Sequence, residues 1–274
     1  MIFDTHAHYD DEWFDEDREA LLRGLSSRGV GTVVNVGASM RGSRASVALA
    51  AEWPDVYAAV GVHPDDAPKM SDADIEELRA LAGQKKVVAI GEIGLDYGHE
   101  DELTDCERDR QRATQAYWFR RQLALAAELS LPVIIHSRGA EGDTLAIMRE
   151  YAASFTDSAT CPGGIIHCFS GSPETAAEYR RLGFHIGVGG VITFKNARRL
   201  PDVVAEAPMS QIMLETDAPY MAPVPFRGKR NDSGYLPYVV AKIAEIKGIS
   251  EEEVIAVTTA NARTLFGIGG EKDA

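Results

Sequence analysis

The chain is poor in cysteine and in basic side chains. Its 274 residues include three cysteines, Cys106, Cys161 and Cys168, with no CxxC spacing, so we expect no disulfide framework. Lysine and arginine number 28 against 42 aspartates and glutamates, which gives a formal net charge of −14. Proteins that coat nucleic acid need a broad basic surface. This charge argues against that class but allows an enzyme that grips a single phosphate locally.

Long apolar runs and a signal segment are also missing. No stretch approaches the ~20 apolar residues that a membrane span needs. The first residues, from Met1 to His6, carry neither a basic region nor an apolar signal core. We therefore expect a cytoplasmic protein with no membrane part and no obligatory protein partner. Hydrophobic residues make up 45% of the chain, which is enough for one large core and argues against global disorder.

Short β-rich runs alternate with longer amphipathic stretches along the whole chain. Eight strands are predicted, at residues 2–5, 32–36, 56–62, 87–92, 132–136, 164–168, 185–189 and 212–216. Their near-continuous apolar character is typical of strands buried on both faces of a parallel sheet. Eight β/α alternations without a linker predict a single domain over residues 1–274, an α/β TIM (β/α)8 barrel. A doubly wound open sheet is the competing arrangement.

Helix boundaries are predicted from capping residues. Ser71 is a candidate N-cap, and Ser172 is followed by a proline at the first helical position. Ser250 and Glu253 have the spacing of a capping box before an apolar-periodic run. The longest helix is expected from about residue 110 to residue 130.

Histidines and carboxylates follow directly on the predicted strands. Eight such groups stand at strand ends: His6, His8, His63, Glu92, His136, His167, Glu215 and Asp217. In a (β/α)8 barrel the carboxyl ends of all strands open at one mouth, where active sites lie. A single histidine at a strand end is usually structural, but the repeated placement favours one shared site. His99, in a polar loop, and His185, at the start of a strand, are expected to be structural.

Imidazole and carboxylate groups together form the ligand set of zinc, manganese and similar divalent ions. His6 and His8 are two residues apart, so in an extended chain they face the same side and can bind one ion. Glu92 could bridge two ions through its two oxygens, and His136 and His167 could hold the second. Because this set exceeds the needs of one tetrahedral ion, we expect two divalent ions (Mg, Mn or Zn), about 3.5–4 Å apart.

Other groups at the same rim have less definite roles. Asp217 shares a face with Glu215 by the same two-residue rule, and Glu215 either supports a ligand or carries a proton. Asp4 either caps a turn or orients the first histidine. His63 could bind a metal, contact a phosphate or donate a proton. Cys168 is expected to point away from the site and to pack as a small apolar residue.

Substrate-binding positions are predicted from local basic residues. Arg227 and Lys229 follow the eighth strand, and loops after the last barrel strands commonly bind phosphate. Arg138 could add a bidentate contact. A further basic group follows the seventh strand, with a solvated charge run as the alternative: Lys195, Arg198 and Arg199. Three aromatic side chains could stack on bases or pack in the core: Phe194, Tyr220 and Phe226.

Six short motifs together resemble those of the TatD-type metal-dependent deoxyribonucleases. In order they are DTHAH at 4–8, GVHP at 61–64, GEIGLDY at 91–97, IHSR at 135–138, HCFSG at 167–171 and LETDAP at 214–219. The resemblance runs from Met1 to about Phe266. It implies a TIM barrel of the amidohydrolase type that binds divalent ions and hydrolyses DNA, often as an exonuclease, with single strands or ends as the expected substrate.

The resemblance also implies how the ligands are shared. One ion would be held by His6, His8, Glu92 and Asp217. The other would be held by Glu92, His136 and His167. Asp217 would also be a candidate proton acceptor for the attacking water, and His63 would be an additional histidine of the site. Glu92 stands where many amidohydrolases carry a carbamylated lysine, which disfavours the hydantoinase and phosphotriesterase branches.

The chain departs from the family pattern at three places. Tyr9 replaces a more usual aliphatic residue, residues 99–108 are acidic, and Asn231 to Gly234 read NDSG where Asn-Glu-Pro is commoner. The last two are expected to border the substrate groove. Two other functions stay open: a bimetal hydrolase of an amide, lactone or aminoacyl ester with the same centre, and a non-catalytic scaffold barrel.

Overall fold

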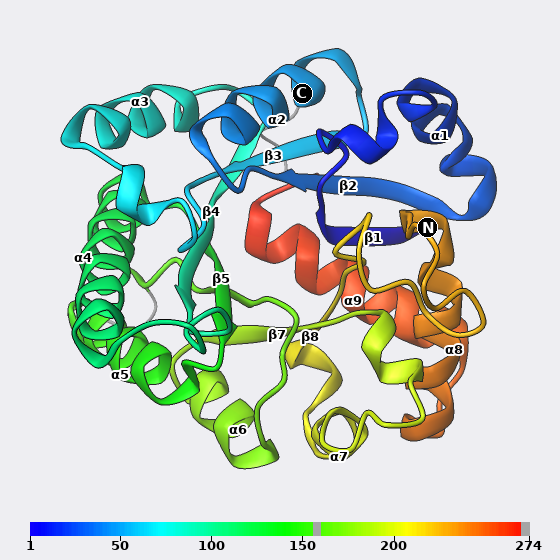
Figure 1. The fold of residues 1–274 in the computed structure, drawn as a ribbon. Helices are drawn as coiled ribbons and strands as arrows, with labels where there is room; N and C mark the ends of the chain where they lie inside the picture. Colours follow the sequence, from blue (N-terminus) through cyan, green and yellow to red (C-terminus); the bar gives the residue numbers. More distant parts are fainter. Residues whose placement is uncertain (156–159, 270–274) are drawn as a thin grey trace.

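Eight parallel strands, connected by helices, surround a common axis in the computed structural model of the chain, which describes residues 1–155 and 160–269 (Figure 1). The strands are β1 (Ile2–Ala7), β2 (Val30–Val36), β3 (Val56–Val60), β4 (Val87–Asp96), β5 (Val133–Arg138), β6 (Gly164–Ile166), β7 (Phe184–Val188) and β8 (Ile212–Leu214). They pair in sequence order from β1 to β8. The predicted (β/α)8 barrel is thereby confirmed, and the open doubly wound sheet is excluded, since that fold needs a different strand order.

The barrel closes just beyond the carboxyl ends of its first and last strands. Ala7 and Ala218 form a parallel bridge, and the His8 N–H donates to the Ala218 carbonyl oxygen at 2.7 Å. Further contacts at the same seam join the Thr216 N–H to the His6 carbonyl. This closure brings residues more than 200 positions apart in the sequence to the same point of the rim.

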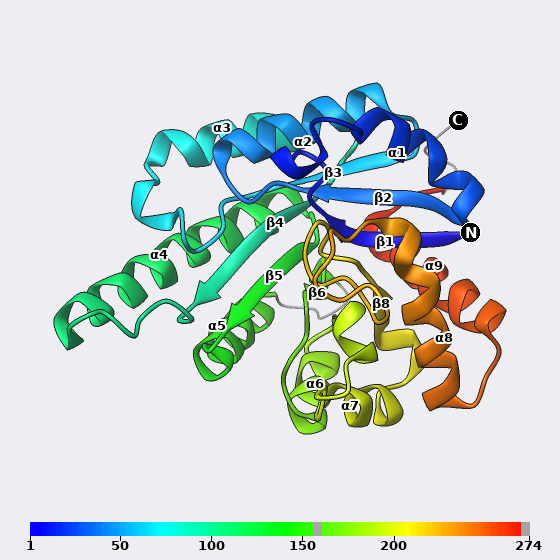
Figure 2. The same cartoon turned by 45° about the vertical axis from the view of Figure 1, so that its right-hand side comes forward.

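Helices form an outer layer around the strands (Figure 2). They are α1 (Arg18–Gly24), α2 (Met40–Glu52), α3 (Asp72–Ala82), α4 (Asp105–Leu129), α5 (Glu141–Ala153), α6 (Pro173–Arg181), α7 (Leu200–Glu206) and α8 (Leu236–Lys247). Helix α9 (Glu251–Phe266) lies behind the centre of the barrel in Figure 1. Ser71, Ser172 and Ser250 are the N-caps of α3, α6 and α9, as predicted. Helix α4 begins earlier than predicted, because Thr104 and Glu107 form a capping box ahead of it.

Apolar side chains fill the amino-terminal half of the barrel interior. Phe3, Ile134 and Met213 belong to this inner cluster. Helix α9 packs against β1 and β8 and covers the cluster at the amino end of the barrel. The Phe266 ring of α9 stacks on Phe3 with ring centroids 5.9 Å apart. A second, larger apolar layer lies between the strands and the outer helices. The barrel is therefore a packed core rather than a pore, and its polar groups gather at the opposite end.

Two strands change the direction of their side chains part-way along. The pairing of β1 with β2 shifts between Asp4 and Ala7, and that of β4 with β5 shifts between Ile90 and Ile93. Such irregularities insert an extra residue and re-aim the side chains that follow. As a result Phe3 lies in the apolar interior while His6, three residues later, reaches the polar rim.

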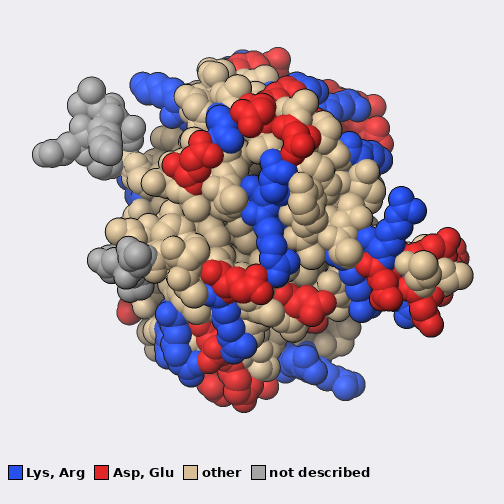
Figure 3. All heavy atoms as spheres, turned by 90° about the vertical axis from the view of Figure 1, so that its left-hand side faces the viewer, with Lys and Arg blue, Asp and Glu red and all other residues tan. Residues whose placement is uncertain are grey.

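Charged side chains of both signs are interleaved on the face that helices α3, α4 and α5 form (Figure 3). Ion pairs on this face include Arg120–Glu150 at 2.7 Å and Arg121–Asp72 at 2.7 Å. No broad basic patch covers this face, in keeping with the acidic composition. None of the helices in residues 1–155 and 160–269 is long and apolar enough to cross a membrane.

Candidate metal centre

Four side chains, from strands β1 and β4 and from the segments directly after β1 and β8, converge at the carboxyl end of the barrel. The Nε2 atoms of His6 and His8 lie 3.0 Å apart. Each of them lies 3.6 Å from the Glu92 Oε2. The Asp217 Oδ1 lies 3.8 Å from the His6 Nε2 and 3.4 Å from the His8 Nε2. The lone pairs of two imidazoles and two carboxylates are thus directed at one point.

These separations fit the coordination shell of a divalent ion. Ligands bonded at about 2.1 Å to one ion are separated by roughly 3.0–3.4 Å along the edges of an octahedron or tetrahedron. The measured distances among His6, His8, Glu92 and Asp217 run from 3.0 to 3.8 Å. The donor set, neutral imidazole with carboxylate, is the one that zinc and manganese accept. These residues therefore fit a metal ion.

A second group forms around the other oxygen of Glu92. The His136 Nδ1 lies 2.9 Å from the Glu92 Oε1, and the His136 Nε2 lies 2.9 Å from the Asp96 Oδ2. The His63 ring packs edge-on against His136 with centroids 4.3 Å apart, and His63, Glu92 and His136 form one candidate cluster. Glu92 therefore presents one oxygen to each group, which is the arrangement expected of a bridging ligand.

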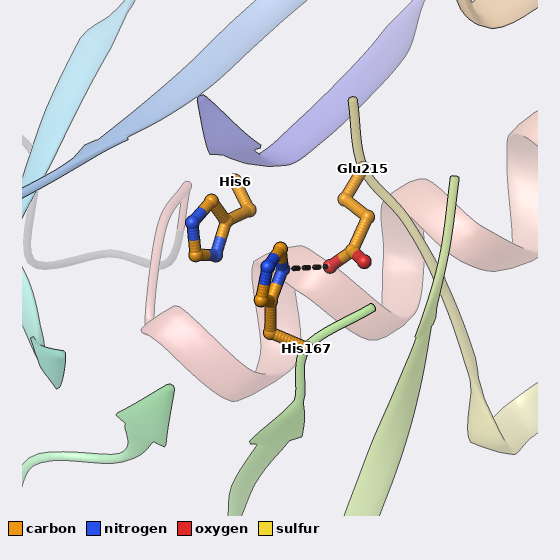
Figure 4. Close-up of side chains that lie close together, drawn as sticks. All are labelled: His6, His167 and Glu215. Atoms are coloured by element: carbon orange, nitrogen blue, oxygen red, sulfur yellow. Dashed lines mark ion pairs between the residues drawn. The ribbon is translucent and has the colours of Figure 1, made fainter. Parts of the chain in front are cut away.

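His167 lies between His6 and Glu215 (Figure 4), and its Nε2 lies 3.8 Å from the Glu92 Oε1. Its ring stacks on His6 with centroids 3.6 Å apart, and its Nε2 lies 3.6 Å from the Asp217 Oδ1. On the far side of the ring, its Nδ1 lies 3.1 Å from the Glu215 Oε2. Such a carboxylate fixes the ring orientation of a metal-binding histidine and raises its basicity.

Glu215 is itself held in place by its surroundings. It is fully buried, and its Oε1 accepts the Cys168 N–H at 2.6 Å. Gly187 on β7 leaves the room for this carboxylate, because a Cβ at that position would collide with its oxygens. Of the two roles left open by the sequence, this placement favours support of His167 over transport of a proton.

Burial and neighbouring carboxylates pull the histidine pKa values in opposite directions. Burial disfavours the charged form of all these rings. The carboxylates of Asp217 and Glu92 outweigh it at His8 and raise its pKa to about 9. Asp96 and Glu92 likewise raise the pKa of His136 to about 10. At His6 burial dominates, with the charge of His167 acting in the same direction, and its pKa falls to about 4.

The two carboxylates are held in their ionised form. Burial alone would raise their pKa values, but the surrounding imidazoles outweigh it, and the pKa of Glu92 lies well below its ordinary value. The pKa of Asp217 is lowered in the same way, chiefly by His167 and His8 against the effect of burial. Without a metal ion, the negative carboxylates thus face the protonated imidazoles of His8 and His136, while the imidazole of His6 is neutral.

Two residues beside His167 in the candidate centre have a left-handed backbone. Asp217 has φ 57° and Cys168 has φ 46°, values that non-glycine residues rarely adopt. Strained backbone of this kind costs about 1–3 kcal/mol and clusters at functional sites. The turn at Asp217 lets both Asp217 and Glu215 reach His167, although β8 has already ended and the two-residue rule no longer applies.

The prediction for Cys168 was wrong. Strand β6 ends at Ile166, so the alternation that was expected to turn Cys168 away from the site does not extend to it. Its sulfur lies in one cluster with the ligand atoms of His167 and Asp217, and it lines the cavity beside them. The positive φ at this position turns the side chain back toward the mouth.

Asp4 ties the first strand to the last instead of touching the imidazole of His6. Its Oδ2 accepts the Thr216 Oγ1–H and the Ser233 Oγ–H, each at 2.6 Å, and its Oδ1 accepts the Thr216 N–H at 3.0 Å. It also accepts the backbone N–H of His6 at 3.2 Å. Asp4 therefore positions the first histidine through its backbone, at the seam where the barrel closes.

Two departures from the family pattern contact each other. The Tyr9 hydroxyl lies 2.7 Å from the Ser233 Oγ, and both residues are fully buried. Asn231 is also fully buried, and its Nδ2 donates to the Thr216 carbonyl oxygen at 2.9 Å. The expectation that this segment borders the substrate groove is wrong for Asn231 and Ser233, because they are packed beneath the rim.

Sequence reasoning missed three supports of the site. Asp96 faces His136, as described above. On helix α4, Gln122 accepts the Val62 N–H at 2.8 Å and Gln115 accepts the Asp96 N–H at 3.0 Å. Both glutamines are buried and also donate to the carbonyl of the same residue. Their seven-residue spacing on one helix face was the signal that could have revealed them.

A cavity of about 640 Å³ opens beside the metal centre. Its lining includes His136 and Asp217 from the site, together with the basic side chains of Arg138, Arg198 and Arg199. The lining also includes the apolar side chains of Phe169, Val191, Leu200 and Met221. Arg198 and Arg199 of the predicted basic group after β7 thus line the same cavity as Arg138.

The other predicted substrate contacts lie elsewhere. Within the described part of the chain, Arg227, Lys229 and Lys195 are not among the residues that line this cavity. The Arg227 guanidinium lies over the Phe194 ring, 4.5 Å from its centroid. The Phe226 ring stacks on Tyr235 at 4.3 Å. The predicted substrate roles of Arg227 and Lys229 stay predictions, without support from this geometry.

Comparison with known proteins identifies the family. A family model described as TatD related DNase matches residues 3–267. The chain belongs to the TatD family. A Bacillus subtilis (strain 168) protein named as uncharacterized metal-dependent hydrolase YabD is 40% identical over 268 residues, which cover 98% of this chain and 100% of that protein. TatD-family membership makes the chain a metal-dependent hydrolase, as the motifs predicted.

Two further relatives extend the comparison to a named activity and to a solved structure. A Cronobacter sakazakii (strain ATCC BAA-894) protein named as 3'-5' ssDNA/RNA exonuclease TatD is 33% identical over 271 residues, which cover 97% of each chain. The crystal structure of YjjV, a TatD homolog from Escherichia coli K12, matches with a TM-score of 0.86 at 34% identity, over 97% of this chain and 98% of that one. These likenesses extend over nearly the whole TatD-family barrel.

Proposed function

We propose that this TatD-family hydrolase is a deoxyribonuclease that uses two divalent ions to remove nucleotides from the ends of single-stranded DNA. The observation that carries the proposal is the placement of Glu92, whose two oxygens face two separate histidine groups. Two ions bridged in this way are suited to an in-line displacement at phosphorus, because charge develops on both the attacking and the leaving oxygen.

Each side chain of the site has a role in this reaction. His6, His8, Glu92 and Asp217 would hold one ion, and Glu92, His136 and His167 the other. When bound, such ions supply an activated water and positive charge opposite the phosphate. Asp217, whose pKa is lowered, stays ionised at neutral pH and can accept the proton of the attacking water. His63, whose ring packs against that of His136, would contact the phosphate or donate a proton to the leaving group.

The cavity beside the centre supports a phosphorylated substrate. Arg138, Arg198 and Arg199 are exposed there, and guanidinium groups bind phosphate through paired N–H donors. The protein as a whole is acidic, with a net charge of −14, so a long duplex would be repelled outside this cavity. A single strand that enters by its end meets the local positive charge first. The exonuclease name of the Cronobacter relative agrees with this substrate.

Digestion of end-labelled oligonucleotides tests the proposal. The metal-free protein is incubated with Mg, Mn or Zn and with single-stranded DNA, duplex DNA or RNA labelled at either end. We expect metal-dependent release of mononucleotides from single-stranded DNA. Replacing Glu92 by Gln removes the charge that both groups share and should abolish this turnover, whereas Glu77→Gln, at a half-buried surface residue paired with Arg44, should leave it unchanged. Undiminished turnover in the Glu92 variant would overturn the assignment.

The apolar residues that line the cavity favour a second candidate function. Phe169, Val191 and Leu200 offer little to a polyphosphate but could hold a small acyl group. The same centre could then hydrolyse an amide, a lactone or an aminoacyl ester, because activated water also attacks carbonyl carbon. A panel of these substrates, run beside the oligonucleotides, decides between the two. Turnover of a carbonyl substrate without any of nucleic acid would replace the first function by the second.

A further inference from the structure

Trp13 exposes a large aromatic ring at the mouth of the barrel. It lies in a 3-10 helix, Glu12–Phe14, just after β1, and 55% of its surface is exposed. Its neighbour Phe14 is fully buried and anchors the segment in the core, so Trp13 is not needed for that purpose. An indole ring exposed to water does not contribute the free energy of stabilisation that burial of such a side chain usually gives. An exposed tryptophan beside a catalytic centre is therefore a candidate for contact with a ligand.

The backbone of Trp13 is fixed on both sides, although its ring is exposed. Its N–H donates to the Asp11 Oδ1 at 2.9 Å, and its carbonyl accepts the Arg230 Nη1–H at 2.6 Å. Arg230 is anchored in turn by a bidentate pair with Asp17, at 2.8 and 2.6 Å. These contacts fix the backbone that carries the ring, so little ordering of the backbone is needed when a ligand binds.

Tyr220 links this ring to the metal centre. Its ring lies 6.3 Å from that of Trp13 and 6.5 Å from that of His8, measured between centroids. Its hydroxyl donates to the Asp11 Oδ2 at 3.1 Å, so Asp11 holds both aromatic residues through its two oxygens. Tyr220 is 47% exposed. The two rings form an aromatic platform that begins directly beside a predicted metal ligand.

The other aromatic candidates of the rim are already engaged. Arg227 lies over one face of Phe194, and Phe226 is stacked on Tyr235. The Trp13 ring contacts Tyr220 only at a tilt of 49°, which leaves its faces accessible to a planar group. Base stacking on such rings tolerates any sequence, because every base has a π face.

Charge differs across the mouth. The platform follows β1, and acidic residues surround it in the sequence: Asp10, Asp11, Glu12 and Asp15. The cavity with Arg138, Arg198 and Arg199 follows β5 and β7, and β5 lies opposite β1 in an eight-stranded barrel with this strand order. A polyanionic chain is attracted to the basic side and repelled from the acidic one. Only the end of a strand, with few phosphates, suits the platform.

We propose that the aromatic platform of Trp13 and Tyr220 binds the base of the terminal nucleotide of a single-stranded nucleic acid. The phosphate to be cleaved then lies at the metal centre, and the remaining strand leaves over the basic cavity. The inference rests on the proposed nuclease function and deepens it. The platform determines how the end is recognised, while the acidic residues around it prevent the strand from continuing past it.

Kinetics on matched oligonucleotides test this platform. One substrate ends in a normal nucleotide, and the other carries an abasic sugar at the same terminal position. For Trp13→Ala we expect KM on the normal substrate to rise about tenfold with kcat little changed, and KM on the abasic substrate to stay as in the unaltered protein. Trp13→Phe keeps an aromatic face and should restore most of the affinity. Tyr117→Ala is the matched control, because Tyr117 is 50% exposed on the outside of α4.

The outcomes separate this inference from the proposed function. If Trp13→Ala digests both substrates like the unaltered protein, the platform is overturned and the nuclease function stands. If it loses activity equally on both, Trp13 acts on the structure of the rim and not on the base, which also overturns the inference. If the unaltered, metal-loaded protein releases no nucleotide from DNA or RNA, the nuclease function itself fails, and the platform loses its ligand.

Discussion

The carboxyl and amino ends of the barrel are built from the same strands but serve different purposes. At the carboxyl end His6, Glu92 and His167 are buried together without an apolar environment to stabilise them. At the amino end Phe3 packs on Phe266 in an apolar interior. The closely packed end stabilises the strands, and this stability allows the opposite end to hold like charges and strained backbone.

Backbone conformation shows the same contrast. In the described residues, four non-glycine residues have a positive φ, and three of these lie at the carboxyl rim: Cys168, Asp217 and Met221. The fourth, Ser130, ends a helix. Strain is thus concentrated where side chains must be aimed at a common point. We therefore expect that activity and stability can be altered separately in this molecule.

Removal of divalent ions should have the largest effect on activity. Dialysis against a chelator should reduce hydrolysis to background, because a metal-dependent hydrolase needs its ions to activate the attacking water. Addition of Mn or Zn should restore it. Far-ultraviolet circular dichroism should show that the fold persists, since the apolar amino end needs no metal. Full activity after exhaustive chelation, verified by elemental analysis, would refute the metal assignment.

A smaller loss is expected when the support of His167 is weakened. Glu215→Gln keeps the shape of the side chain but removes the charge that faces the His167 Nδ1 at 3.1 Å. Loss of such a supporting carboxylate typically costs about 10–100-fold in metal affinity or activity. Metal titration and steady-state kinetics measure both. Glu245→Gln, at an exposed position on α8, is the control, and equal behaviour of the two variants would contradict the supporting role.

Metal affinity should depend on pH through the histidines. In the metal-free protein, carboxylates outweigh burial and raise the pKa of His8 to about 9 and that of His136 to about 10. These rings hold protons at neutral pH, and a metal ion must displace them. Affinity should therefore rise with pH, about tenfold per pH unit for each displaced proton, until the pH passes these pKa values. Calorimetry in two buffers of different ionisation enthalpy measures the protons released, and none released would contradict the prediction.

The smallest effect on catalysis is expected at the amino end. Phe266→Ala removes a buried ring that stacks on Phe3 and should lower the free energy of unfolding by about 3–5 kcal/mol. Because no residue of the metal centre contacts this ring, kcat per folded molecule should stay unchanged. Urea denaturation and kinetics at low temperature test the two statements together. A large fall in kcat would show that the two ends are coupled.

Much of the fold was predictable from the sequence. Local apolar runs identified all eight strands, and serine caps at Ser71, Ser172 and Ser250 marked helix starts. The polar groups that follow the strands identified the rim and the family. The role of Asp96 was missed and the choice between the two roles of Glu215 stayed open, because their partners His136 and His167 come from other parts of the chain. Trp13 was missed because nothing local shows that its ring stays exposed.

The sequence by itself determined the alternation of strands and helices and the kinds of side chain that follow each strand, because both depend on neighbours along the chain. Tertiary structure alone decided where those side chains point. A strict two-residue alternation from Phe3 or Ala89 in the apolar interior would turn His6 and Glu92 away from it. Register shifts in β1 and β4 re-aim both residues, and a positive φ does the same for Asp217 and Cys168. Those shifts arise from hydrogen bonding between strands that are distant in sequence, so they become fixed only when the barrel assembles.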